Sequence, residues 1–252
     1  MKTKTTLFGI LSASLIMAGA SSAITVIDLS TGPPASGSAN GAQLFASDPQ
    51  PTGSGVIDPF LREQNNGSEL GINTSISKPP YDDKPGIFTH DLLVSALSTI
   101  SYQGVDYYEF DLDANQSGND PISLTTFKVF VTSGAPFTDE NDLINLVNTG
   151  TPAFDLNGAG AVRVDITSNK GSGQGDMFIL VPKIDIGDSG NLYLFAGFSA
   201  DAAGGGFPSD DGFEEWSAAT GPRTIPDGGV TIALLGSALV GMHLLRRKMA
   251  RC

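Results

Sequence analysis

Apolar and polar residues alternate along several short stretches of this chain, and the alternation predicts β-strands. In residues 108–113 apolar side chains alternate with acidic ones, and residues 162–167 repeat the pattern. A period of two gives a strand one apolar face and one polar face. Residues 177–181 and 192–198 are apolar at nearly every position, which is typical of strands in the middle of a sheet. A further strand is predicted over residues 126–132.

Turn-forming residues separate these predicted strands and favour an all-β fold. The chain contains 31 Gly and 15 Pro among 252 residues, and both residue types interrupt regular structure. One short helix is predicted over residues 139–148, where Leu143, Ile144 and Val147 recur at helical spacing. Many short strands between turns predict an antiparallel β-sandwich with a jelly-roll-like arrangement over residues 56–220.

The N-terminal region is predicted to hold an export signal and a loose arm. Residues 1–23 combine Lys2 and Lys4, an apolar run and a small-residue end at Ala23. These are the three parts of a secretory signal peptide, so we expect cleavage after Ala23 and export through the Sec translocon. Residues 24–55 are rich in Gly and Pro and are predicted to be a flexible arm.

The C-terminal region has the pattern of a membrane anchor. Residues 221–229 form a predicted linker and motif, residues 230–245 are apolar, and residues 246–252 are basic. Sixteen helical residues span about 24 Å, slightly less than a hydrocarbon core of about 30 Å. Basic residues flanking a transmembrane helix favour the cytoplasmic side, so the sandwich is expected outside the membrane. A permanent anchor and a detachable one both fit this pattern.

The order of motif, apolar helix and basic tail resembles the C-terminal exosortase signals of the PEP-CTERM type, in particular the VPDSG-CTERM variant. The matching positions are the sorting motif Ile225, Pro226, Asp227, Gly228 and Gly229, the run Leu234-Leu235-Gly236, and the basic residues Arg246, Arg247 and Lys248. Ile225 stands where the family has Val, and Gly228 where it has Ser. The resemblance implies that an exosortase-like membrane protease removes the tail and releases the protein to the bacterial surface or extracellular matrix.

Three further stretches are similar to ectodomains of proteins with such tails. They are residues 107–116, 171–177 and 211–216. No activity is assigned to these ectodomains, so this resemblance adds an expected fold and no mechanism.

Composition excludes several classes of function. The formal net charge is −13, which disfavours binding to the phosphates of nucleic acids. One Cys cannot form an internal disulfide, and two His leave little for a histidine-rich metal site. His90 is the only histidine between the predicted signal peptide and the predicted membrane helix. The sequence contains no G-x-S-x-G nucleophile motif to accompany it, so His90 is expected at a surface or strand edge.

Two groups of residues are candidate ligand sites. Asp111, Asp113 and Asn115 offer oxygen atoms at every second position, which suits Ca²⁺ if the chain curls after the third. The spacing does not follow an EF-hand loop, and the polar face of a strand that ends in a turn is the favoured alternative. Calcium is therefore a candidate cofactor, and no other cofactor is indicated.

The second candidate site surrounds Trp216, which follows a run of carboxylates. Glu214 and Glu215 beside an aromatic ring could bind a sugar or support a carboxylate-based glycosidase. A final strand with Trp216 packed onto the core is the alternative. We therefore expect a structural or adhesive extracellular protein without catalysis, with a calcium-dependent carbohydrate-binding module or a glycosidase as alternatives. Its expected partners are the exosortase-like protease, the Sec translocon and an extracellular polysaccharide.

Overall fold

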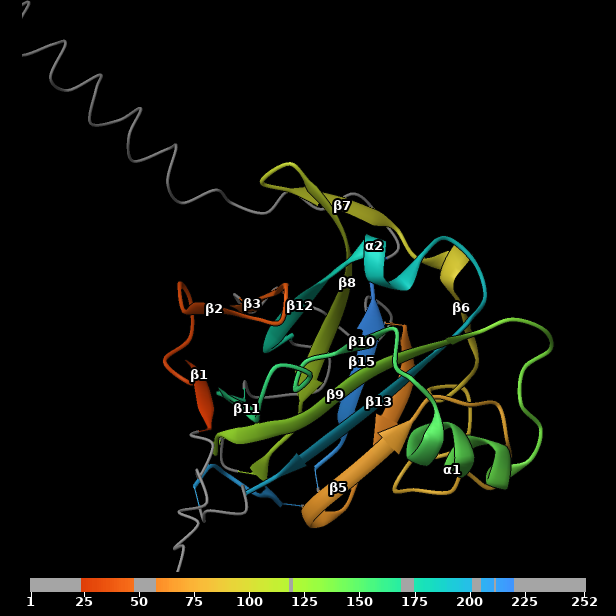
Figure 1. Ribbon diagram of the computed structural model, residues 1–252. Helices are drawn as coiled ribbons and strands as arrows, with labels where there is room; N and C mark the ends of the chain where they lie inside the picture. Colours follow the sequence, from red (N-terminus) through yellow and green to blue (C-terminus); the bar gives the residue numbers. More distant parts are fainter. Residues whose placement is uncertain are drawn as a thin grey trace, which may run out of the picture.

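Two β-sheets packed face to face form the part of the chain that the structure describes (Figure 1). This computed structural model describes residues 24–47, 58–117, 120–168, 175–200, 205–210 and 212–219. The predicted all-β sandwich is confirmed. Within these ranges, every strand pair is antiparallel except that between the strands at residues 25–29 and 162–166, which is parallel.

The first sheet contains eight strands within the described residues. They are β1 (Thr25–Leu29), β5 (Asn66–Ile72), β6 (Leu92–Leu93), β9 (Ile122–Thr132), β10 (Phe154–Asp155), β11 (Val162–Ile166), β13 (Asn191–Ser199) and β14 (Ser209–Asp210). Their main order is β1-β11-β9-β13-β5-β14, while β10 pairs with β9 and β6 pairs with β13.

The second sheet contains seven strands in the same described ranges. They are β2 (Ser36–Ala39), β3 (Ala42–Ala46), β4 (Pro59–Glu63), β7 (Thr99–Tyr102), β8 (Val105–Ala114), β12 (Met177–Pro182) and β15 (Glu214–Ala218). The order is β2-β3-β12-β8-β15-β4, with β7 beside β8. The chain passes repeatedly from one sheet to the other, as from β8 to β9, from β11 to β12 and from β12 to β13, and β4 lies at an edge.

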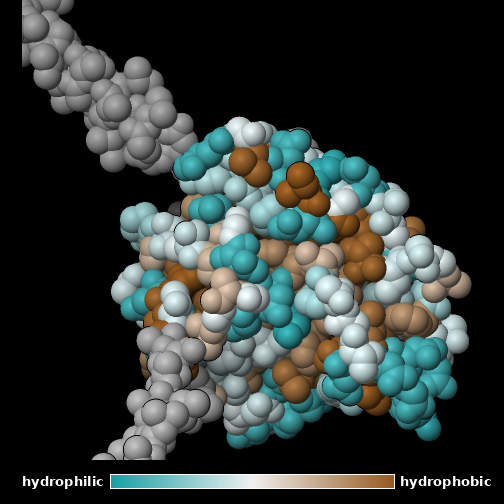
Figure 2. All heavy atoms as spheres, in the orientation of Figure 1, coloured by the Kyte–Doolittle hydropathy of each residue, from teal (hydrophilic) through white to brown (hydrophobic). Residues whose placement is uncertain are grey.

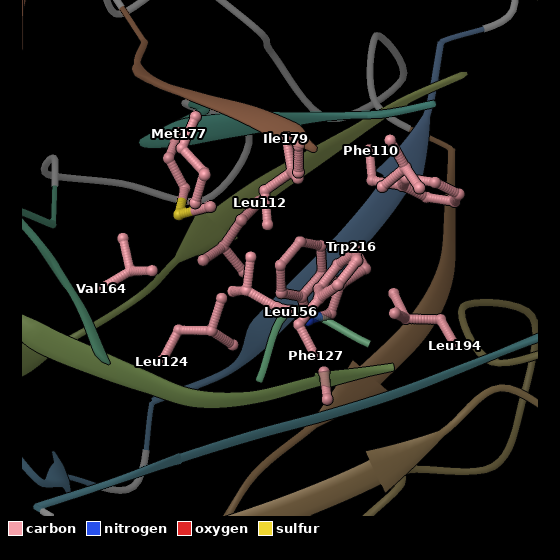
Figure 3. Close-up of a cluster of buried hydrophobic side chains, with 14 of the residues drawn as sticks. Phe110, Leu112, Leu124, Phe127, Leu156, Val164, Met177, Ile179, Leu194 and Trp216 are labelled. Atoms are coloured by element: carbon pink, nitrogen blue, oxygen red, sulfur yellow. The ribbon is translucent and has the colours of Figure 1, made fainter. Parts of the chain in front are cut away.

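The hydrophobic core fills the space between the sheets (Figure 3). Phe127 lies at its centre, with its ring centroid 5.9 Å from that of Phe110 and 5.3 Å from that of Trp216. Large side chains such as these each contribute about 1.5–3 kcal/mol by leaving water. The alternation predicted for residues 108–113 is confirmed, because Tyr108, Phe110 and Leu112 all belong to this core.

A second apolar cluster explains why β13 is buried on both faces, as its sequence predicted. Tyr193 and Phe195 point away from the main core and pack with Leu143 of helix α1 (Glu140–Thr149). The predicted helix is confirmed, and the Asp139 side chain caps it by accepting a hydrogen bond from the Asn141 N–H at 2.8 Å. A 3₁₀ turn, η1 (Val94–Ala96), and a one-turn helix, α2 (Lys183–Ile186), complete the described elements.

The prediction of a flexible arm over residues 24–55 is wrong for most of that segment. Residues 25–46 contribute β1, β2 and β3, and Leu29, Ala42 and Leu44 have no exposed surface. The Gly and Pro residues mark tight turns between these strands; Gly32 and Gly41, for example, have φ angles of +70° and +89°. Glycine adopts this left-handed region without the steric cost that other residues meet.

The sequence motifs at both termini lie outside the described residues. These are the signal peptide, the sorting motif, the transmembrane helix over 230–245 and the basic tail. Among the helices that the structure does describe, none has the length and apolar character needed to cross a bilayer.

Hydrophobic side chains on the face in Figure 2 form small patches separated by hydrophilic ones.

Candidate functional site

Four buried carboxyl groups gather between the two sheets at the edge formed by β4 and β5. Glu63 and Glu69 come from these two strands, Glu214 comes from β15, and Asp83 comes from the loop after β5. Their exposed fractions are 0%, 1%, 0% and 4% in that order. We call these four residues the carboxyl cluster.

Strand alternation directs these side chains inward. Glu63 lies two residues after Leu61 on β4, and Glu214 lies two residues before Trp216 on β15, so each shares the face of a core residue. Glu69 is paired in register with Phe198 of β13, another core residue. The carboxyl cluster therefore continues the hydrophobic core toward the edge of the sandwich.

One oxygen of each carboxyl group accepts a hydrogen bond from the protein. Trp216 Nε1 donates to Glu63 Oε1 at 3.2 Å, and the Asn65 N–H donates to Glu69 Oε2 at 2.8 Å. The Gln116 amide donates to Glu214 Oε1, and the Ile72 N–H donates to Asp83 Oδ1. The other oxygen in each group is buried without a donor, which is costly for an ionised carboxylate.

A short segment closes this edge of the sandwich, and we call residues 81–84 the strap. The Lys84 N–H donates to the Arg62 carbonyl of β4 at 2.8 Å, and the Asp82 N–H donates to the Leu70 carbonyl of β5 at the same distance. Asp83 also forms an isolated antiparallel bridge with Glu63. The strap thus joins the two sheets and covers the carboxyl cluster.

The space inside the cluster is narrow. A Cβ atom added to Gly71 of β5 would lie 2.6 Å from Glu63 Oε2 and 2.8 Å from Asp83 Oδ1. Glycine is therefore needed at this position so that the two carboxyl groups can lie over the β5 backbone.

Burial raises the pKa values of all four groups. Desolvation is the main cause for Glu63, whose pKa lies well above its ordinary value of 4.5, and the charges of Glu69 and Asp83 raise it further. Burial raises the pKa of Asp83 to about 7, although backbone N–H groups oppose the shift. No ion pair within the described residues joins a basic side chain to the cluster.

Glu69 and Glu214 are arranged as a pair that can share one proton. Burial, followed by the hydrogen bond with Glu69, raises the pKa of Glu214 to about 11. Burial also raises the pKa of Glu69, although this same hydrogen bond lowers it in part. A proton held on Glu214 would donate to Glu69. This proton supplies the donor that the two carboxylates would otherwise lack.

The sequence-predicted calcium ligands lie on a different face. Asp111 and Asp113 belong to β8, which stays extended through Ala114, and the Asn115 amide donates to the Phe213 carbonyl at 3.0 Å. Alternate residues of an extended strand project side by side rather than converging on one ion. Across the described residues, no group of three or more His, Cys, Asp or Glu side chains is placed to hold a metal ion.

Trp216 is a core residue and offers no surface to a ligand. Its side chain has 0% exposure, and its ring stacks near Phe198 with the centroids 6.2 Å apart. The ligand role considered for Trp216 is therefore not supported, and the core-packing alternative is confirmed. The neighbouring acids are no more available to a ligand. Glu214 is fully buried, and the Glu215 carboxylate lies 3.9 Å from the Arg62 guanidinium.

His90 borders a surface pocket beyond the strap. The pocket has a volume of about 360 Å³ and is lined by residues 75–77, 85–86 and 89–90. The His90 N–H donates to the Phe60 carbonyl at 2.9 Å, which places it along β4 and agrees with the strand-edge interpretation.

The sequence analysis missed three members of the carboxyl cluster. Glu63, Glu69 and Asp83 lie far from Glu214 in sequence, and only the pairing of β4 with β15 and β5 with β13 brings them together. The alternation of β4 did indicate one of them, because Glu63 lies two residues after Leu61 and therefore points to the same inward face.

Comparisons with family models, with curated proteins and with solved structures give no match to this chain.

Proposed function

We propose that this chain is an exported structural or adhesive protein of a bacterial surface or extracellular matrix, without catalytic activity. Export through the Sec translocon precedes transient anchoring by residues 230–245. An exosortase-like protease then acts at the motif Ile225 to Gly229, and Arg246, Arg247 and Lys248 hold the tail on the cytoplasmic side.

The main support for this proposal is the position of the sandwich between the predicted signal peptide and the predicted sorting motif. β1 begins at Thr25, directly after the expected cleavage at Ala23, and β15 ends at Ala218, before the sorting motif. Removing both signals would leave every described strand in place. The repeated passage of the chain from one sheet to the other further supports a jelly-roll-like arrangement.

Substitutions in the sorting motif test this proposal. The wild-type chain is expected in the extracellular or surface fraction of a bacterium that carries an exosortase. Replacing Pro226 and Asp227 with Ala should retain the chain in the inner membrane, whereas Thr224→Ala should be released normally. Equal release of all three chains would contradict sorting. Unchanged cohesion of the extracellular layer in a strain lacking the protein would contradict the structural role.

The arrangement on the outer face of the second sheet favours a carbohydrate-binding module as a second candidate function. Asp111 is directly opposite Phe178, whose ring stacks on Phe45 with the centroids 4.9 Å apart. Tyr102 contacts the same Phe45 ring at 5.6 Å. Phe178 itself is buried, whereas Phe45 and Tyr102 are half-buried. A sugar can stack on the two half-buried rings while a carboxylate accepts bonds from its hydroxyl groups.

Binding measurements distinguish this candidate from a purely structural role. Binding to a glycan array that Phe45→Ala abolishes and Ile184→Ala, a change at an exposed residue of α2, leaves intact would support it. Calorimetry with Ca²⁺ tests whether the ion contributes. Absence of glycan binding with and without Ca²⁺ would remove this candidate.

A further inference from the structure

We propose that the strap, residues 81–84, is a proton-controlled latch on the β4–β5 edge: it stays closed while Asp83 and Glu63 are neutral and opens when they ionise. This inference concerns the folded domain alone and does not depend on the proposed function.

The strap is held by a small set of contacts on both sheets. On the β4 side, the Gln64 N–H donates to the Asp82 carbonyl at 3.3 Å, in addition to the bond from Lys84 to Arg62. On the β5 side, the Leu70 N–H donates to Asp82 Oδ2 at 3.0 Å, and the Ile72 N–H donates to Asp83. Breaking these contacts frees the strap without separating the strands of either sheet.

Acidic groups surround Glu63 and Asp83 within the carboxyl cluster. β4 presents Glu63, β5 presents Glu69, β15 presents Glu214, and the strap itself carries Asp82. The Tyr81 side chain packs on Phe195 with the ring centroids 5.2 Å apart.

Two basic residues, Arg62 on β4 and Lys84 on the strap, form no ion pair with Asp83. Arg62 points to the outer face, where it pairs with Glu215 and lies 4.7 Å over the ring of Phe213. Lys84 contacts β4 through its backbone N–H. A negative charge on Asp83 would therefore face other acids across a buried space without a counter-ion, which is strongly unfavourable.

Opening the strap would expose the ionised groups to water at a lower free-energy cost than unfolding the whole domain. Water would reach Glu63 and Asp83 once the strap moved away, while the core around Phe127 would remain packed. The pKa of Asp83 near 7 places the change in the neutral range. Because this pKa is raised in the folded state, the preference for the closed form is greatest at acidic pH, falls as the pH rises above the ordinary value of 3.8, and is lost by about pH 7.

Amide hydrogen exchange of the full-length chain in a non-ionic detergent tests the latch. Protection factors are measured at about pH 5 and about pH 8 and corrected for the intrinsic exchange rate. We expect protection of the Gln64, Leu70, Ile72 and Lys84 amides to fall about tenfold or more at the higher pH. Protection of β13 should change much less. Equal protection of the strap contacts at both pH values would overturn the proposal.

Asp83→Asn provides the decisive variant, because an amide retains an acceptor for the Ile72 N–H and has no proton to lose. Its strap should stay protected at both pH values, whereas Asp106→Asn, at an exposed position on β8, should behave like the wild type. If Asp83→Asn does not fold, Glu63→Gln is measured and should reduce the pH dependence. Retention of the full dependence in the folded variant would overturn the latch.

A cation site is the main competing explanation for the same cluster. Addition of Ca²⁺ at about pH 8 should leave strap exchange unchanged if protons control the latch. Restoration of protection by Ca²⁺ in the wild type would overturn the proposal, because the cluster would then be a cation site.

Discussion

Asn73 should be among the most sensitive polar residues of the fold, because its side chain replaces a missing segment of strand pairing. The side chain has no exposed surface. Its Oδ1 accepts a hydrogen bond from the Leu194 N–H at 2.6 Å, and its Nδ2 donates to the Leu192 carbonyl at 3.0 Å and to the His90 carbonyl at 3.2 Å. It thereby ties β13 to the point where the chain returns after the strap.

Asn73→Ala would leave the Leu194 N–H and the two carbonyls without these partners. Each buried backbone group left unsatisfied costs about 1–3 kcal/mol, and relaxation and water entry recover part of this sum. We therefore expect a loss of about 3–5 kcal/mol, a large fraction of the total stability of a typical domain.

Urea unfolding followed by fluorescence measures this loss directly. Trp216 is the single tryptophan and is fully buried, so its emission reports the core. Asn65→Ala is the matched control: this exposed side chain donates to Asp82 Oδ1 at 2.9 Å, and its loss should cost less than about 1 kcal/mol. Equal midpoints for the two variants would refute the argument that Asn73 completes the sheet.

Four further outcomes are expected. The free energy of unfolding should fall by up to about 4 kcal/mol between about pH 4 and pH 7, because the pKa of Asp83 rises from 3.8 to about 7 on folding; a urea series showing rising stability over this range would contradict it. Trp216→Phe should cost about 2–4 kcal/mol by circular dichroism, and more at alkaline than at acidic pH, because the indole N–H stabilises ionised Glu63. Asp139→Ala should cost about 1 kcal/mol through loss of the α1 cap, and an unchanged melting temperature would exclude that role. Gly71→Ala should cost about 1–3 kcal/mol, since the new methyl group would press on the carboxyl cluster; wild-type stability would show that the cluster has room to move.

Local patterns were sufficient to predict the long elements of this fold. β12 and β13 follow from continuous apolar runs, β8 from alternation, and α1 from helical spacing with Asp139 at its start. These signals are carried by neighbouring residues, so no knowledge of distant contacts was needed.

Elements that depend on distant contacts were not predictable in the same way. β1 is held in its sheet because it pairs in parallel with β11, more than 100 residues away along the chain, and β3 is held because it pairs with β12. Their Gly- and Pro-rich turns resembled a flexible arm when considered locally. The carboxyl cluster was missed for the same reason, whereas the acidic run before Trp216 was visible but was considered for ligand binding rather than as part of the interior.

Intact-mass analysis of the protein recovered outside a bacterium that carries an exosortase tests the central claim most directly. The account predicts one species that begins at Ile24 and ends within residues 225–229. A chain retained in the inner membrane with residues 230–252 still attached, or one that keeps residues 1–23, would contradict it.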